Sequence, residues 1–216
     1  MAGLRKPHSR RIFTLRQALL AGVSVEDIHE ASGIDPWFIR QMRDIVDMET
    51  RIRDFGLAND MTPLNPELPE ILREAKEYGF SDRQLSEMWK RPETDIRRLR
   101  KEMGIVPTFY LVDTCAAEFE AYTPYFYSTY APGAKSEARR SDKKKVVVLG
   151  AGPIRIGQGV EFDYSTVHAV QTIRRAGYEA IIINNNPETV STDYTTADKL
   201  YFEPLTPEDV MNILHE

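Results

Sequence analysis

Apolar side chains recur every three or four residues over much of the first hundred residues, the pattern of helices that bury one face. The clearest run follows Asp35 and Pro36, which suit the N-cap and the first helical position. The apolar positions of this run are Phe38, Met42, Ile45 and Ile52. Their spacing predicts a helix of about five turns.

Start and stop signals predict shorter helices on both sides of this run. Ser24 with Asp27 begins one helix, and Ser81 with Gln84 resembles a capping box. A further helix is expected over residues 92–103, because the glycine that follows it is typical just past a helix C-terminus. This part of the chain is therefore predicted to be an all-α helical domain.

Aromatic residues accumulate where the helical period disappears, between residues 105 and 130. They are Phe109, Tyr110, Phe119, Tyr122, Tyr125, Phe126, Tyr127 and Tyr130. Rings of this size are more often buried contacts than a platform for a ligand, since each covers a large apolar area. We expect an extended, packed segment, and we assign residues 1–130 to one helical domain with an extended aromatic tail.

A small, polar and charged stretch over residues 131–142 is typical of an exposed linker. Beyond it, apolar runs at 145–149, 180–183 and 199–202 predict strands, and helical patterns lie between the first two and at 207–215. This β-α-β-β-α order indicates an incomplete α/β unit with a Rossmann-like parallel sheet over residues 143–216. Three strands are too few for a complete domain of this class, so the chain is expected to be truncated.

The turn after the first predicted strand is rich in glycine, the context in which backbone N–H groups approach a phosphate or carboxylate. Its glycines are Gly150, Gly152, Gly157 and Gly159. The dinucleotide fingerprint would need a glycine at Arg155, so a NAD site is disfavoured. A small anion or polar ligand remains possible, and so does a tight turn without a ligand.

Acidic residues follow two of the predicted strands. Glu161 and Asp163 come soon after the glycine-rich turn, and Glu188 follows the next strand. Carboxyl ends of neighbouring parallel strands line one crevice, so these acids and Arg155 could face a common space. Isolated acids of this kind are more often solvated or stabilise a helix N-terminus.

Composition narrows the classes of function. The formal net charge is −5 and neither half is strongly basic, which argues against nucleic-acid binding. The single cysteine, Cys115, cannot form an internal disulfide, and the four histidines show no metal-ligand spacing, so no metal is assigned. Because apolar runs are short and no signal peptide is evident, we expect a cytoplasmic protein without membrane contact.

Several long motifs resemble the large chain of carbamoyl phosphate synthase. VVVLGAGPIRIGQGVEFDYSTVHAV, NNNPETVSTDY and LYFEPLT are similar to the start of its second, carbamoyl phosphate-forming half, a pre-ATP-grasp domain. GIDPWFIRQMRDIV and VDTCAAEFEAYTPYFYSTY are similar to the oligomerisation domain that precedes that half. The resemblance covers nearly the whole chain.

This resemblance implies a segment of an ATP-dependent carbon–nitrogen ligase that makes carbamoyl phosphate from bicarbonate, ATP and glutamine-derived ammonia for pyrimidine and arginine synthesis. It implies no catalytic residue and no cofactor in this segment, because ATP and Mg²⁺ or Mn²⁺ belong to ATP-grasp domains outside it. The isolated segment is therefore predicted to be inactive. The implied partners are other large chains, a glutaminase small chain and the ATP-grasp domains.

By the same resemblance, four positions border a tunnel that carries carbamate between the two halves. These are Arg155, Gly159, Glu161 and Glu188. A glycine leaves the tunnel wide enough for a small solute, and acids with an arginine can steer an unstable anion.

Two other classes stay open from the residues alone. Residues 80–104 could be a helix-turn-helix, with Arg97, Arg98, Arg100 and Lys101 as its basic face, which predicts salt-sensitive DNA binding. Alternatively, the chain is a stand-alone module whose glycine-rich turn binds an anion or nucleotide.

Overall fold

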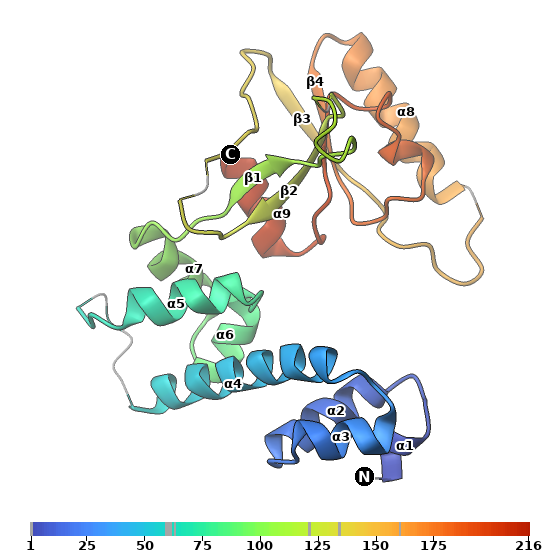
Figure 1. Cartoon of the computed structure of the whole chain (residues 1–216). Helices are drawn as coiled ribbons and strands as arrows, with labels where there is room; N and C mark the ends of the chain where they lie inside the picture. The colour runs from blue at the N-terminus through green and yellow to red at the C-terminus, as the bar shows by residue number, and fades with distance from the viewer. Residues whose placement is uncertain (1, 59–61, 63, 121, 134, 160) are drawn as a thin grey trace. The chain divides into compact units, whose positions relative to one another are not determined.

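The computed structural model describes residues 2–58, 62, 64–120, 122–133, 135–159 and 161–216 (Figure 1). The chain divides into two compact units, Met1–Met103 and Gly104–Glu216. Within the described ranges, no helix combines the length and the apolar character that a membrane span requires.

The described residues of the first unit form helices and no strand. They are α1 (Ala2–Arg5), α2 (Arg11–Leu20), α3 (Val25–Ser32), α4 (Pro36–Ala58), α5 (Leu68–Glu77), α6 (Asp82–Trp89) and α7 (Glu93–Glu102). The predicted start signals are confirmed: the Ser24 hydroxyl accepts a hydrogen bond from the Asp27 N–H, and Ser81 and Gln84 form a capping box. The long helix begins at Pro36 as predicted.

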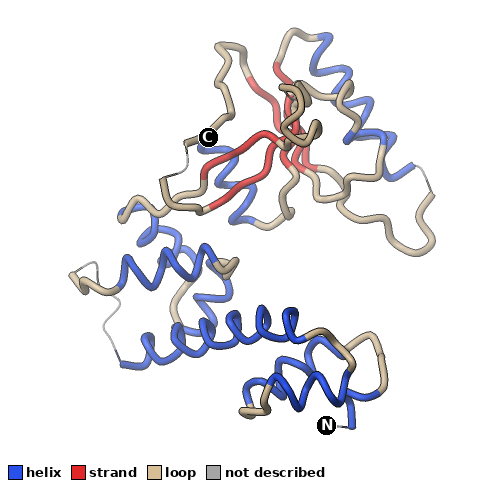
Figure 2. The backbone as a smooth tube through the Cα atoms, in the orientation of Figure 1, coloured by secondary structure: helices blue, strands red, loops and turns tan. Residues whose placement is uncertain are grey.

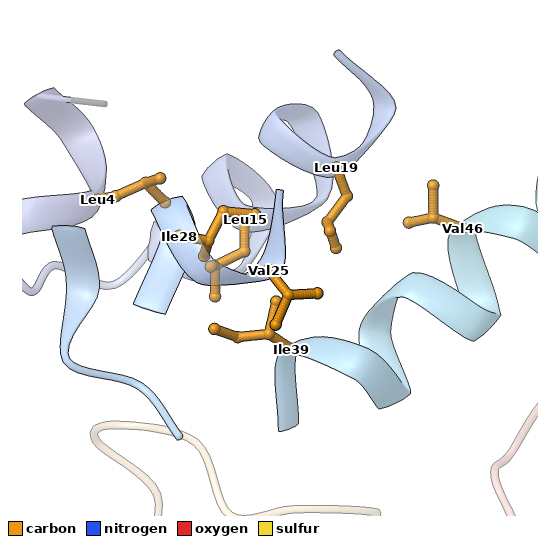
Figure 3. Packing of buried hydrophobic residues seen from close by; sticks show 7 residues of the cluster. All are labelled: Leu4, Leu15, Leu19, Val25, Ile28, Ile39 and Val46. Atoms are coloured by element: carbon orange, nitrogen blue, oxygen red, sulfur yellow. The ribbon is translucent and has the colours of Figure 1, made fainter. Parts of the chain in front are cut away.

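Seven aliphatic side chains from α1 to α4 form one buried cluster of this unit, and Figure 3 shows them pointing toward one another. They are Leu4, Leu15, Leu19, Val25, Ile28, Ile39 and Val46. On α4, Ile39 and Val46 are buried in this cluster and Ile52 is buried further along the helix, whereas Phe38 and Ile45 are 59% and 46% exposed. Two of the four apolar positions that predicted the helix, Phe38 and Ile45, are therefore exposed.

A close approach joins α4 to α6 at Gly56. A Cβ atom there would lie 2.2 Å from Cδ1 of Trp89. The buried Trp89 indole also donates a hydrogen bond from Nε1 to the backbone oxygen of Ile52, at 2.8 Å. Glycine is therefore needed at residue 56, although it is an unfavourable residue inside a helix.

Charged side chains are also buried in this unit. Arg100, with no exposed surface, donates from Nε to both carboxylate oxygens of Asp82 at 2.9 Å. The Lys76 ammonium lies 3.4 Å from the same carboxylate. Glu49 accepts from the guanidinium groups of Arg16 and Arg53. The ion pair between Arg16 and Glu49 therefore connects α2 to α4, and the pairs of Asp82 connect α6 to α5 and α7.

The second unit contains a sheet of five strands, which Figure 2 draws in red. The strands are β1 (Thr108–Leu111), β2 (Tyr125–Thr129), β3 (Lys145–Leu149), β4 (Glu179–Ile183) and β5 (Lys199–Tyr201). Helix α8 (Glu161–Arg175) joins β3 to β4, a short 3-10 helix η1 (Val190–Thr192) precedes β5, and α9 (Pro207–His215) ends the chain. The predicted β-α-β-β-α order is thus present from β3 onward.

The sheet order is β1-β2-β5-β4-β3, and its strands are not all parallel. The pairs β2–β5, β5–β4 and β4–β3 are parallel, but β1 and β2 are antiparallel. The expectation of a purely parallel sheet was therefore incomplete. A short antiparallel ribbon from the aromatic segment adds two strands to the predicted three.

This ribbon also changes the division of the chain, which falls after residue 103 and not after residue 130. Phe109 of β1 and Phe126 of β2 are buried against Tyr201 of β5, each with ring centroids 5.2 Å from it. Residues 104–130 thus belong with the sheet and are not a tail of the helical domain. Phe119 and Tyr122, in the connection between β1 and β2, are exposed.

Both faces of β4, which lies between β5 and β3, are covered. Ile181 and Ile183 pack in one apolar cluster with Ile213 of α9, and Ala180 and Ile182 pack in another with Val170 of α8. Successive side chains of a strand point to opposite faces, so α8 and α9 lie on opposite sides of the sheet. The second unit therefore has three layers.

Candidate functional site

The carboxyl ends of three parallel strands meet at one edge of the sheet, where open α/β sheets bind their ligands. The chain leaves β3 at Gly150, β4 at Asn184 and β5 at Phe202. Helix α8 begins at the same edge and packs against β3 and β4 (Figure 1). The candidate site is built from the segments that leave these strands.

Gly150 and Asn184 hold the first two of these segments together. The Gly150 N–H continues the β3–β4 ladder by donating to the Ile183 oxygen at 2.8 Å. A Cβ atom at Gly150 would lie 2.4 Å from Cγ of Asn184, so glycine permits the close approach. Asn184 is fully buried, and its Oδ1 accepts from the N–H of Gly152 at 3.1 Å.

A second asparagine strengthens this connection. Asn186 is buried, and its side-chain amide donates to the oxygen of Gly152 at 3.3 Å. Its Oδ1 accepts from the N–H of Glu188 at 2.9 Å. The short asparagine side chains thus satisfy the N–H and the oxygen of the buried Gly152 and also hold the Glu188 N–H.

The rest of the glycine-rich turn closes on itself. Gly152 and Gly157 have φ values of +73° and +89°, a region that favours glycine. The N–H of Arg155 donates to Oε1 of Gln158 at 2.7 Å, and the N–H of Gln158 donates back to the Arg155 oxygen at 3.0 Å. The side chain of Arg155 is exposed.

Gly159 and Glu161 are in direct contact at the start of α8. The Gly159 N–H donates to Oε1 of Glu161 at 3.1 Å, and a Cβ atom at Gly159 would lie 2.4 Å from Oε2 of that carboxylate. Hydrogen bonds from its own backbone N–H and from that of Gly159 lower the pKa of the Glu161 carboxyl. This exposed carboxylate therefore stays ionised at neutral and mildly acidic pH.

Glu188 is exposed and lies beside a buried connection between its own segment and α8. The next residue, Thr189, donates from Oγ1 to Oδ2 of Asp163 at 2.5 Å. The Ser191 N–H donates to the same oxygen at 2.6 Å. Asp163 is only 4% exposed and lies two residues beyond Glu161.

The structure therefore brings Gly159 and Glu161 into contact and places Glu188 one residue from a bond to the same helix. Among the hydrogen bonds and ion pairs of the described residues, none joins the side chain of Arg155 to either glutamate. The N–H groups of Gly152, Arg155 and Gly159 are bound by side chains of the chain itself and are not collected around one point. That arrangement differs from the phosphate cradle that a glycine-rich turn suggests.

Sequence reasoning missed the structural part played by Asn184 and Asn186. It considered Asp163 as an acid that faces a crevice or solvent, whereas its side chain is buried. An available signal was the run of three asparagines directly after a strand. Asparagine bonds readily to nearby backbone groups, so such a run indicates a loop held by its own side chains.

Comparisons with known proteins agree with the division into two units. Residues 1–104 match the sequence model described as the carbamoyl-phosphate synthetase large chain oligomerisation domain. Residues 142–216 match the one described as the carbamoyl phosphate synthase preATP-grasp domain. Relatives named carbamoyl phosphate synthase large chain are 54% identical in Archaeoglobus fulgidus, over 97% of this chain, and 55% and 51% identical in Methanosarcina barkeri and Synechocystis, each over 98%. The chain belongs to the carbamoyl phosphate synthase large chain family.

The resemblance seen in the sequence is thus confirmed. The chain spans 19% of the length of each of these carbamoyl phosphate synthase large chains. The preATP-grasp match begins just before β3, so β1 and β2 lie outside both matched ranges although they complete the sheet.

The helical unit of this carbamoyl phosphate synthase segment does not present the basic cluster that the sequence suggested on α7. Arg100 is buried in its pair with Asp82, and Arg98 pairs with Asp95 at 3.1 Å. Arg97 is half-buried. An exposed face formed by all four cations is therefore not present.

Proposed function

We propose that this chain is the part of a carbamoyl phosphate synthase large chain that joins its two synthetase halves, with one unit for self-association and one that borders the passage for carbamate. The complete enzyme would make carbamoyl phosphate in the cytoplasm, for pyrimidine and arginine synthesis. The observation that carries this proposal is the tandem match, in family order, of an oligomerisation domain and a preATP-grasp domain.

Catalysis in the proposed enzyme belongs to domains outside these residues. ATP-grasp domains would bind ATP with Mg²⁺ or Mn²⁺, and a glutaminase small chain would supply ammonia. Among the described residues, no group of three or more histidine, cysteine or acidic side chains is arranged to hold a metal ion. As the family resemblance implies, we propose that the nucleotide and metal ligands lie in those other domains.

The carboxyl edge of the sheet suits contact with carbamate. Carbamate decomposes once it is protonated, so a wall that carries it must not donate protons. The lowered pKa of Glu161 keeps that carboxylate ionised, and an ionised carboxylate has no proton to give. The exposed arginine at residue 155 supplies a positive charge on the neighbouring turn.

Substitution of Gly159 is the most direct test of this passage. Any side chain at residue 159 would occupy space that glycine leaves free. We expect Gly159→Val, in the full-length large chain supplied with ammonia, to slow carbamoyl phosphate formation more than ADP release. Carbamate that cannot pass would be lost, so more than two ADP would be released per carbamoyl phosphate. The matched control is Ala169→Leu, which adds bulk at an exposed position of α8. A ratio of two in both variants would count against the passage.

Self-association has support from exposed aromatic surface on α4. Trp37 and Phe38 are 55% and 59% exposed and lie edge to face, with ring centroids 4.9 Å apart. Ile45, two turns further on, is 46% exposed on the same side of the helix as Phe38. Clustered apolar side chains at a surface mark an interaction site, and we propose a second large chain as the partner.

A further inference from the structure

Two carboxylates of the proposed passage, those of Glu161 and Glu188, are carried by different elements. Glu161 is the first residue of α8, whereas Glu188 lies in the connection between β4 and β5. Their separation is therefore set by whatever holds that connection to the helix. The distance matters, because a passage for a small anion must exclude water while it remains open.

Among the described residues, hydrogen bonds hold the connection to α8 at two places. Near its start, Thr189 and Ser191 donate to Asp163 on the first turn of the helix. Near its end, Nη1 of Arg174 donates to the oxygens of Thr195 and Thr196, both at 2.9 Å. Only the first attachment adjoins Glu188.

Asp163 is well suited to fix this position. Its carboxylate is buried, so water competes little for the two short hydrogen bonds that it accepts. Both donors bind the same oxygen, Oδ2, while Oδ1 has no hydrogen-bond partner among the described residues. One oxygen atom thus holds the residue after Glu188 and the residue two positions further on.

We propose that Asp163 is a positioning residue of the carbamate passage, which fixes Glu188 relative to Glu161 without touching the solute. This inference rests on the proposed function. If the attachment is lost, the Glu188 segment separates from the start of α8, and carbamate escapes to water before it is phosphorylated.

The test measures ADP released per carbamoyl phosphate formed by the full-length large chain with ammonia supplied directly. Asp163→Ala removes the acceptor, and we expect the ratio to rise clearly above two. Asp163→Asn keeps an oxygen where Oδ2 lies and should remain nearer to two. Thr189→Val keeps the shape of the side chain but removes one donor, so it should also raise the ratio even if Asp163→Ala fails to fold.

Arg174→Ala is the matched control, since it releases the other end of the same connection. We expect this variant to lower the melting temperature and to leave the ratio at two. A ratio of two in both Asp163→Ala and Thr189→Val would overturn the inference. So would equal leakage from Arg174→Ala, because general loosening would then be sufficient.

The Gly159→Val variant distinguishes failure of the proposed passage from failure of the proposed role of Asp163. If Gly159→Val leaks carbamate while the Asp163 and Thr189 variants do not, only the positioning role of Asp163 is lost. If none of these variants leaks, the passage itself is wrong.

Discussion

Substituting Gly56 by alanine should destabilise the helical unit, although the same change stabilises most helices. At an ordinary interior position, alanine is favoured over glycine by about 1 kcal/mol. At Gly56 the added Cβ would lie 2.2 Å from Cδ1 and 2.9 Å from Nε1 of Trp89. The indole must therefore move, and it is buried and bound to the Ile52 oxygen.

The balance can be worked from the structure. Forcing an extra carbon into a packed interior costs about 1–3 kcal/mol, and losing the indole hydrogen bond costs about 0.5–1.5 kcal/mol. After the gain in helix propensity is subtracted, the free energy of unfolding should fall by about 0.5–3.5 kcal/mol. Steric conflict thus outweighs propensity.

Tryptophan fluorescence gives a specific assay, because the chain has only two tryptophans and both lie in the helical unit. In a Trp37→Phe background, Trp89 alone reports urea unfolding of that unit. A second comparison uses Trp89→Phe, followed by circular dichroism, in which the smaller ring should remove most of the cost of Gly56→Ala. If Gly56→Ala were as stable as the parent chain, the close approach of α4 and α6 would not be a real constraint.

Two further predictions concern the same unit. Phe38→Ser combined with Ile45→Ser should lower the mass of the full-length large chain in sedimentation velocity, and an unchanged assembly would contradict self-association through this face. For Glu49, burial raises the pKa of the carboxyl, but hydrogen bonds from Arg16 and Arg53 outweigh burial and lower it overall. Its contribution to stability is therefore present above pH 4.5, the ordinary pKa of glutamate, and is lost as the pH falls through the lower folded value. Melting curves of Glu49→Gln should accordingly differ from the parent chain at neutral pH and converge with it in acid.

Local signals predicted the helices well. Ser24, Ser81 and Pro36 each mark a helix start in the sequence and also in the structure. A cap is a contact between residues three positions apart, so the sequence contains everything needed to recognise it. The buried face of α4 was harder to predict from the sequence, because apolar residues occur on more than one side of that helix.

Contacts between distant residues were harder to predict. Nothing near Phe109 or Phe126 indicates that β2 pairs with β5, which lies about 70 residues later. Likewise, the four passage positions came from family resemblance, and the attachment of Thr189 to Asp163 spans 26 residues. Whether an acid is exposed like Glu161 or buried like Asp163 depends on which segment returns to cover it.

The strand pair β1–β2 has a consequence for exchanging parts between relatives. A graft that began at residue 142, where the preATP-grasp match starts, would bring β5 without its own β2 and set the apolar surface around Tyr201 against a ribbon from the other parent. A ribbon that does not fit this surface would leave β5 poorly paired, and unpaired strands join other chains and aggregate. Hybrid synthases should therefore be joined near residue 104, so that the ribbon and the sheet it completes are inherited from the same parent.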